Sequence, residues 1–334
     1  MRVMRLTQPA PIESRPLARA QQPMPEPGPG ALRVRVEVCG VCRTDLHVVE
    51  GELAPRHAAV TPGHQVVGRV EAVGAGVSTR ALGARVGIPW LHAACGECRF
   101  CTRGDENLCV APQFTGWDVD GGYAEFALAP AAFVYELPDA LPPDQAAPLL
   151  CAGIIGYRAF RRSRAAPGAR LGLWGFGASA HIAIQVARHR GCDVYVFSRA
   201  REHGRLAEEL GARWVGGSFD APPVPLDAAI LFAPAGELVP VALERLDRGG
   251  TLAIAGIHLS DVPSLDYQRH LFQERTVTSV TANTRDDGRA LLGLAAEIPI
   301  RTHVTNYPLE RANEALLDLK QDRIRGAAVL DLRG

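Results

Sequence analysis

Six short apolar segments, separated by stretches of helical length, define the architecture expected for residues 153–282. Alternation of strand and helix predicts βαβ units and therefore a parallel sheet. Four segments are strongly apolar and two are weaker, and together they reach the strand count of a complete doubly wound sheet. They are Arg170–Gly175, Asp193–Phe197, Arg213–Val215, Leu226–Phe232, Thr251–Gly256 and Thr276–Val280.

The first 150 residues or so have a different pattern. Glycine and proline interrupt short apolar runs, and Pro25–Gly30 is typical of a loop. The run Leu32–Val38 alternates apolar and charged side chains with period two, which indicates a half-buried strand. This part of the chain therefore predicts a β-rich domain with little helix.

The C-terminal part predicts a return to that first domain. Helices are expected at 287–297 and 310–320, and a last strand at 327–332. The predicted organisation is a β-rich domain formed by residues 1–152 and 283–334, and an α/β domain formed by residues 153–282.

Composition narrows the function. The 334 residues include 36 basic and 36 acidic side chains, 47% hydrophobic and 22% charged residues, which is typical of a globular protein with two domains. Intrinsic disorder, collagen and a coiled coil are excluded. A net charge of zero leaves no basic excess for a phosphate backbone, so we expect no nucleic-acid partner.

The N-terminal segment lacks the apolar core of a signal peptide, and no stretch approaches 18 uncharged apolar residues. We therefore expect a cytoplasmic protein without a membrane partner. The chain has eight cysteines, several of them three residues apart. Because the cytosol keeps thiols reduced, we expect these cysteines to bind metal instead of forming a framework of disulfides.

Four cysteines form the strongest motif, a C-x2-C-x2-C-x7-C cluster inside one loop. Four thiolates within such a short segment can complete a tetrahedral Zn²⁺ shell with no open position, so this loop predicts a structural zinc site. Unrelated cysteines or a disulfide pair are the alternative. The cysteines are Cys95, Cys98, Cys101 and Cys109.

Three further candidates are scattered along the chain. Cys42 precedes Arg43-Thr44-Asp45-Leu46-His47, His64 follows a glycine, and Cys151 follows two leucines. Each is ambiguous alone, since a lone histidine or cysteine is often a core residue. Together they supply a Cys₂His set, which leaves zinc one position for water or substrate.

The Cys42–His47 segment, His64, the four-cysteine loop, Cys151 and the α/β domain follow one another in an order that is typical of one enzyme family. The chain resembles the zinc-dependent medium-chain alcohol dehydrogenases over essentially its full length, which implies a GroES-like catalytic domain and a nucleotide-binding domain. Trp90 and the segment 120–125 resemble bacterial members that act on small primary alcohols. The family also implies a homo-oligomer, either a dimer or a tetramer.

The resemblance implies a mechanism that agrees with the chemistry of the residues. Zinc would bind the alcohol as an alkoxide, which passes a hydride to the nicotinamide cofactor. Thr44 and His47 would carry the alcohol proton to solvent. Asp45 would hold His64 in the required tautomer.

One position departs from the family pattern. Gln65 follows His64 where relatives usually have glutamate. A neutral amide cannot act as an alternative anionic ligand, so zinc should still bind, with altered turnover or metal retention.

A G-x-G-x-x-A motif lies where the first α/β strand meets its helix. In this context it predicts a Rossmann dinucleotide site, with Gly175 at the turn, Gly177 beside the pyrophosphate, and Ala178 and Ala180 in the helix that follows. The resemblance also places Arg43 beside the pyrophosphate.

The end of the second strand bears on cofactor choice. Phe197 is followed by Ser198 and Arg199, with no carboxylate to hold the ribose diol or to repel a 2′-phosphate. NADP(H) is therefore favoured over NAD(H). The alternative is that Arg199 stacks on the adenine or faces solvent.

Two other functions match parts of the pattern. One is a quinone or enone reductase of the same superfamily, but such enzymes lack the zinc ligands that Cys42, His64 and Cys151 supply here. A zinc-ribbon interaction protein that senses NADPH would need a recognition surface, and would bind one zinc per chain where the enzyme binds about two.

The sequence does not identify the alcohol substrate. Trp90 and Trp117 are candidates for the substrate pocket, and the alternative is that they only pack against neighbouring side chains.

Overall fold

The computed structural model describes residues 1–333, which form two compact units. The first unit contains Met1–Cys151, Ala282–Leu292 and the segment from Thr302 onward. The second contains Ala152–Thr281 and Gly293–Arg301. None of the helices formed by residues 1–333 is long and apolar enough to cross a membrane.

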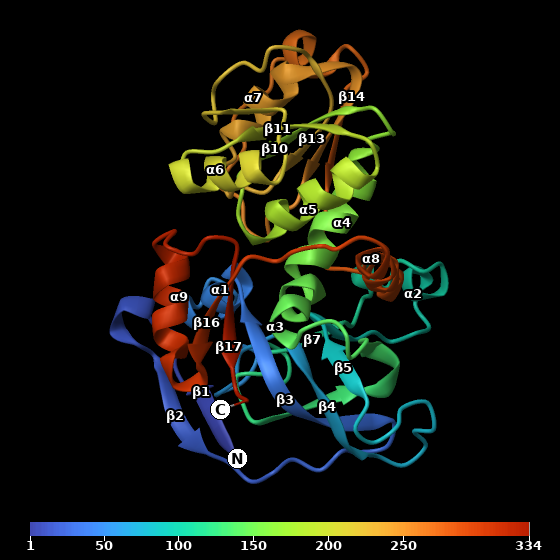
Figure 1. The fold of residues 1–334 in the computed structure, drawn as a ribbon, viewed down its shortest axis with the longest axis vertical. Helices are drawn as coiled ribbons and strands as arrows, with labels where there is room; N and C mark the ends of the chain where they lie inside the picture. Colours follow the sequence, from blue (N-terminus) through green and yellow to red (C-terminus); the bar gives the residue numbers. More distant parts are fainter. Residues whose placement is uncertain (334) are drawn as a thin grey trace. The chain divides into compact units, whose positions relative to one another are not determined.

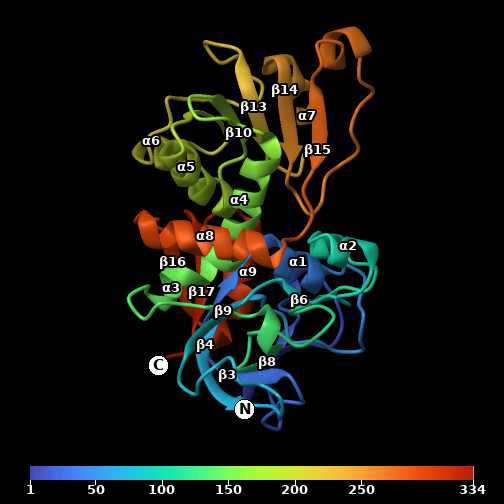
Figure 2. The ribbon, with the colours of Figure 1, turned by 90° about the vertical axis from the view of Figure 1, so that its right-hand side faces the viewer.

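The second unit is built on a six-stranded parallel sheet with the order β12-β11-β10-β13-β14-β15 (Figures 1 and 2). Its central strands are almost wholly buried apolar runs, as expected for a parallel sheet covered on both faces. Strands β10 to β12 are added in one direction across the sheet, and β13 to β15 are added on the other side of β10. The switch point between β10 and β13 is where doubly wound folds bind ligands. The strands are β10 (Arg170–Trp174), β11 (Asp193–Phe197), β12 (Trp214–Gly216), β13 (Leu226–Leu231), β14 (Leu246–Ile254) and β15 (Thr276–Ser279).

Four helices of this unit pack against its strands or one another. They are α4 (Ala152–Ser163), α5 (Ala178–His189), α6 (Arg201–Glu209) and α7 (Leu238–Arg245).

The first unit is organised around β3, whose inward side chains alternate with exposed ones and form the main core. Its sheet has the order β16-β17-β3-β4-β5-β9, with β8 also paired to β3. The C-terminal strand β17 pairs antiparallel with β3, with Leu330 opposite Cys39. The strands are β3 (Ala31–Val41), β4 (Gln65–Val73), β5 (Arg85–Ile88), β8 (Phe126–Pro130), β9 (Tyr135–Glu136), β16 (Val304–Pro308) and β17 (Ala327–Asp331).

Smaller elements complete the first unit. Two small antiparallel sheets pair β1 with β2 and β6 with β7. These strands and the helices of the unit are β1 (Arg2–Leu6), β2 (Leu17–Gln21), β6 (Leu91–Ala93), β7 (Gln113–Phe114), α1 (Arg43–Glu50), α2 (Arg99–Thr102), α3 (Pro143–Ala146) and α9 (Ala312–Lys320). Helix α8 (Arg285–Glu297) begins in the first unit, and its residues from Gly293 onward belong to the second.

The predicted fold class is confirmed, with differences at element ends. Strand β14 begins at Leu246 instead of Thr251, because Leu246 already pairs with Leu226 before a register shift. Helix α9 begins at Ala312, since the residues before it form a 3₁₀ turn. Strand β16 is not anticipated by the sequence patterns.

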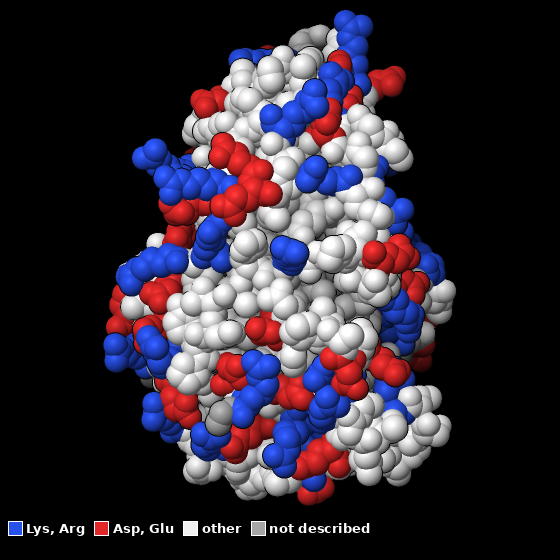
Figure 3. All heavy atoms as spheres, viewed as in Figure 1, with Lys and Arg blue, Asp and Glu red and all other residues white. Residues whose placement is uncertain are grey.

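The surface reflects the charge balance of the sequence. On the face shown in Figure 3, basic and acidic side chains are interspersed over both units. Many form pairs, such as Arg170 with Asp227 and Arg69 with Asp139.

Candidate functional site

Helix α1 begins at a candidate metal ligand. Cys42 is its N-cap, and its Sγ accepts the N–H of Thr44 at 3.3 Å. The Asp45 carboxylate accepts the N–H of Cys42 at 2.9 Å, which completes a capping box. The cap that starts the helix therefore also fixes the position of the Cys42 sulfur.

His64 is placed by a glycine that no other residue could replace without strain. Gly63 has a φ of +102°, and a Cβ there would lie 2.4 Å from the Tyr123 ring and 2.9 Å from Cys39 Sγ. This tight turn brings His64 to the start of β4, where it is fully buried.

The three scattered candidates meet at one point. His64 Nε2 lies 3.2 Å from Cys42 Sγ, and the ligand atoms of Cys42, His64 and Cys151 all lie within 4.8 Å of one another. Cys151 reaches the cluster from the end of a buried 3₁₀ turn, Ala147–Leu150. Residues from three distant segments of the first unit thus meet at one point.

Asp45 fixes the orientation of the histidine. Its Oδ1 accepts Nδ1–H of His64 at 2.8 Å and the N–H of Gly63 at 3.1 Å, and the carboxylate is buried. Because Nδ1 then carries the proton in the neutral ring, the Nε2 lone pair is directed at the sulfurs.

The electrostatics of this cluster favour a cation beside its sulfurs. Burial opposes ionisation of Cys42, but the hydrogen bond from Cys151 and the nearby His64 hold the pKa of the Cys42 thiol well below its usual value. Burial also opposes a charge on His64, yet Asp45 and Cys42 raise the pKa of His64 to about 10. A proton thus compensates the thiolate, and a divalent ion can take its place. Two sulfurs and one imidazole nitrogen suit zinc.

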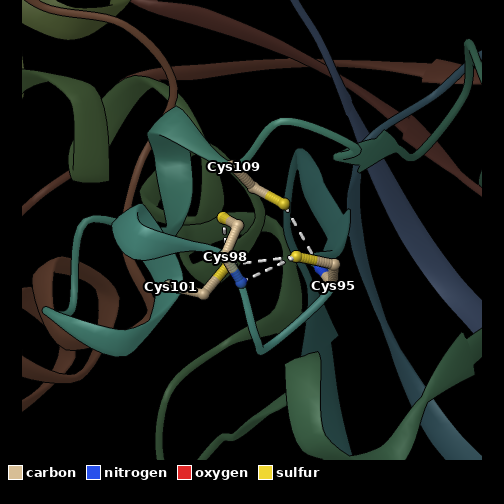
Figure 4. Close-up of side chains that lie close together, drawn as sticks. All are labelled: Cys95, Cys98, Cys101 and Cys109. Carbon is tan, nitrogen blue, oxygen red and sulfur yellow. Dashed lines mark hydrogen bonds between the residues drawn. The ribbon is translucent and has the colours of Figure 1, made fainter.

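The four-cysteine loop forms a second cluster of ligand atoms. Figure 4 shows the side chains of Cys95, Cys98, Cys101 and Cys109 directed toward one another, and their sulfurs lie within 4.8 Å. Backbone N–H groups stabilise the sulfurs: Cys95 N–H donates to Cys109 Sγ at 3.2 Å, and Cys98 N–H donates to Cys95 Sγ at 3.4 Å. Backbone hydrogen bonds lower the pKa of the Cys98 thiol to about 6. Four such donors suit a closed zinc shell.

An ion pair attaches this loop to the rest of the first unit. Glu106, just before Cys109, accepts hydrogen bonds from Arg285 Nε at 3.0 Å and Nη2 at 2.8 Å. Arg285 begins α8, and its guanidinium lies 4.5 Å from the centre of the Phe133 ring. The Glu106 side chain is only 9% exposed, so its carboxylate is largely shielded from water, whereas the Arg285 side chain is 34% exposed.

The candidate proton-carrying residues share one helix. Thr44 and His47 are three positions apart on α1, so they project from the same face. Thr44 is buried, and the His47 side chain is 14% exposed. Arg43 begins the helix and pairs with Asp322 at 2.7 Å.

Of the two tryptophans proposed for the substrate pocket, Trp90 contacts His64 and Trp117 stacks with Trp90. Trp90 meets the His64 ring edge-on, with ring centres 4.9 Å apart, and stacks on Phe114 at 4.8 Å. Trp117 lies parallel to Trp90 at 6.1 Å and is anchored by a hydrogen bond from Nε1 to the carbonyl of Ala54. Sequence reasoning missed Phe114, which has no signal of its own in a two-residue strand.

The nucleotide motif has the expected geometry in the second unit. Gly175 has a φ of +86° at the end of β10, and a Cβ there would crowd Ala233. Nothing lies within 4 Å of the position of a Gly177 Cβ, so the backbone is open to an approaching ligand. Helix α5 starts at Ala178, and Ala180 is fully buried. This helix terminus is suited to a pyrophosphate.

The end of β11 carries the candidate residues for cofactor choice. The Ser198 N–H donates to the carbonyl of Gly216 at 2.9 Å, which fixes the backbone there. Arg199 is exposed immediately after it.

Comparisons with known proteins agree with both units. A family model of the alcohol dehydrogenase GroES-like domain matches residues 28–139, and a model of the zinc-binding dehydrogenases matches residues 180–297. A probable alcohol dehydrogenase, AdhA, from Mycobacterium tuberculosis is 53% identical over 99% of this chain and 97% of its own. The chain belongs to the zinc-dependent medium-chain alcohol dehydrogenases.

Two further similarities each cover at least 91% of the chain. An alcohol dehydrogenase from Geobacillus stearothermophilus is 37% identical over 91% of this chain and 92% of its own. The cobalt- and zinc-bound thermostable alcohol dehydrogenase from Pyrobaculum aerophilum has a TM-score of 0.90 at 27% identity, with 99% of each chain covered. This alcohol dehydrogenase therefore transfers hydride between small alcohols or aldehydes and a nicotinamide cofactor, with the help of zinc.

Proposed function

We propose that Cys42, His64 and Cys151 hold the catalytic zinc of this alcohol dehydrogenase. The observation that carries the proposal is the convergence of the two Sγ atoms of Cys42 and Cys151 on Nε2 of the fully buried His64. Three protein ligands leave one position for the substrate. When bound, zinc supplies a Lewis acid to the alcohol oxygen, and the nicotinamide supplies the hydride acceptor.

The chain's own residues prepare the site and move the proton. Asp45 holds His64 in the tautomer that binds metal. The Thr44 hydroxyl takes the alcohol proton and passes one on, and His47, which is partly exposed, releases it to water. The path thus leads from a buried hydroxyl to a ring in contact with solvent.

The aromatic side chains form one wall of the proposed substrate pocket. Trp90 lies against His64, Phe114 and Trp117 stack with Trp90, and the three rings form an apolar cluster. Such a wall excludes water from the reacting alcohol and favours small or flat substrates.

A test of the catalytic site removes one ligand. Cys151→Ser should abolish alcohol oxidation and release about one zinc per chain, while dinucleotide binding measured by fluorescence stays within about twofold. Cys192→Ser, at a buried cysteine outside the cluster, is the matched control and should keep both activity and zinc. Turnover at the parent rate by Cys151→Ser would refute the assignment.

The cofactor is proposed to bind along the ends of β10 and β11. Gly175, Gly177 and Ala178 would hold the pyrophosphate, with Arg43 as a further cationic contact. Ser198 and Arg199 would bind a 2′-phosphate, so the enzyme should prefer NADP(H). The absence of an acid after Phe197 supports this preference.

Replacing Arg199 tests that preference. A charge-assisted hydrogen bond contributes about 1.5–3 kcal/mol, so Arg199→Ala should lower kcat/KM for NADPH by roughly 10- to 100-fold and leave NADH nearly unchanged. Arg190→Ala, at an exposed arginine after α5, is the control. Equal losses with both cofactors would mean that Arg199 contacts the shared adenine, and a parent that prefers NADH would contradict the proposal.

Three further assignments complete the proposal. The four-cysteine loop is assigned a second, structural zinc on the basis of its donor set. A cytoplasmic location follows from the need to keep those thiols reduced. A homo-oligomer is supported by the edge position of β15, where Val277, Tyr267 and Phe272 expose apolar surface at or near an unpaired strand edge.

A further inference from the structure

Glu52 lies in the loop after α1 and has no role in the proposed function so far. Its carboxylate is hydrogen-bonded to Nδ1 of His47, the residue at the solvent end of the proposed proton path. The Glu52 side chain is 50% exposed and the His47 side chain 14%. Glu52 is therefore the more exposed member of the pair, and the His47 ring is partly exposed.

The backbone holds Glu52 in this place. Gly51 ends α1 in the left-handed region with a φ of +82°, and its N–H donates to the carbonyl of Val48 at 3.3 Å. The N–H of Leu53 then donates to the carbonyl of His47 at 3.1 Å. The chain thus folds back over the last turn of the helix, and Glu52 is returned to the histidine five residues before it.

The same unit uses this pairing at His64. There the buried carboxylate of Asp45 binds Nδ1 and turns Nε2 toward the metal ligands. At His47 a carboxylate again binds Nδ1, but this one is in contact with solvent. A carboxylate that fixes the proton on Nδ1 leaves the lone pair on Nε2, which is the atom that must accept the travelling proton.

We infer that Glu52 is a positioning residue for the proton relay, an inference that rests on the proposed role of His47. Glu52 holds the His47 ring in the tautomer and orientation that present Nε2 to the relay. When Nε2 accepts a proton the ring becomes an imidazolium, which the ionised carboxylate stabilises. The Nε2 proton is then lost to water, which restores the neutral ring with its proton on Nδ1 and leaves the Glu52 carboxylate unchanged.

Other charged groups near α1 have partners of their own. Helix α9 and the 3₁₀ turn Ile12–Ser14 pack against α1. The pairs on these elements are Arg43 with Asp322, Asp45 with His64, Glu50 and Glu13 with Lys320, Glu314 with Arg311, and Asp318 with Arg323. In the loop itself, Arg56 pairs with Asp118 at 3.7 Å.

The test measures the relay and its dependence on His47. Single-turnover formation of reduced nicotinamide should be about tenfold slower in Glu52→Gln than in the parent, with the alcohol KM within about twofold and zinc content unchanged. Glu52→Asp should recover most of the rate, because it keeps the carboxylate. Glu136→Gln, at an exposed carboxylate of the same unit, is the matched control and should match the parent.

A double variant separates the possible outcomes. If Glu52 acts through the ring, Glu52→Gln should cause no further loss in a His47→Gln background. The same tenfold loss in both backgrounds would overturn the inference, as would parent-like turnover by Glu52→Gln. A His47→Gln enzyme with the parent rate would overturn the relay of the proposed function, and this inference with it.

Discussion

The two metal-ligand clusters of the first unit differ in how the chain assembles them. The four-cysteine cluster comes from one loop, and backbone N–H groups bond to its sulfurs. The Cys42–His64–Cys151 cluster brings together three distant segments, and a buried carboxylate orients its one histidine. A local cluster can form wherever its loop folds, whereas the dispersed cluster requires the whole β-rich core to be in place.

The two clusters offer zinc different ligand atoms, and these suit a structural site in one case and a catalytic site in the other. Four thiolates close a zinc shell and contribute to folding. Two sulfurs and one nitrogen leave a position open, and the capping box of α1 and the strained Gly63 turn hold those donors in place. Loss of function in the first unit should therefore take two separable forms, one seen in chemistry and one in stability.

The largest separable effect is expected at Asp45. In Asp45→Asn the amide cannot provide the charge that balances His64, and it binds Nδ1–H more weakly. We expect a loss of about 10- to 100-fold in catalytic zinc affinity and in kcat/KM. Zinc titration, with bound zinc measured by atomic emission, should show weaker binding at the Cys42–His64–Cys151 site and unchanged binding at the four-cysteine site.

A parallel change controls for carboxylate removal in the same unit. Asp139 is an exposed aspartate that pairs with Arg69 and is far more accessible than Asp45. The Asp139→Asn variant should therefore bind both zinc ions as tightly as the parent does. If Asp45→Asn released both zincs together, the two clusters would not be independent.

Sequence patterns anticipate the two clusters unequally. The four-cysteine site can be predicted from its spacing alone, because all its ligands lie in one loop. Cys42, His64 and Cys151 are individually uninformative, and only their order within a family resemblance joins them. The three side chains are brought together by the pairing of distant strands, which no local sequence pattern predicts.

The fold shows the same distinction. The strands around the nucleotide motif are nearly continuous apolar runs, so β10 and β11 could be located within a residue. Strand β16 reads Val-Thr-Asn-Tyr-Pro and forms by pairing with β17, which its own composition does not predict. Glu52 and Phe114 are likewise recognisable only from their contacts with His47 and Trp90.

The smallest effect on chemistry is expected from the four-cysteine cluster. Cys98→Ser removes one of four donors, so we expect about one zinc fewer per chain and a loss of roughly 2–3 kcal/mol in unfolding free energy, which lowers Tm by about 5–10 °C. The ligands of the other cluster lie outside this loop, so initial rates at low temperature should stay within about twofold of the parent. Scanning calorimetry, zinc analysis and steady-state kinetics on the same sample measure all three, with Cys192→Ser as the control for loss of a thiol. A variant with the parent Tm and one zinc fewer would show that the loop does not need its metal, and a large fall in rate at an unchanged Tm would show that the two clusters are coupled through the core.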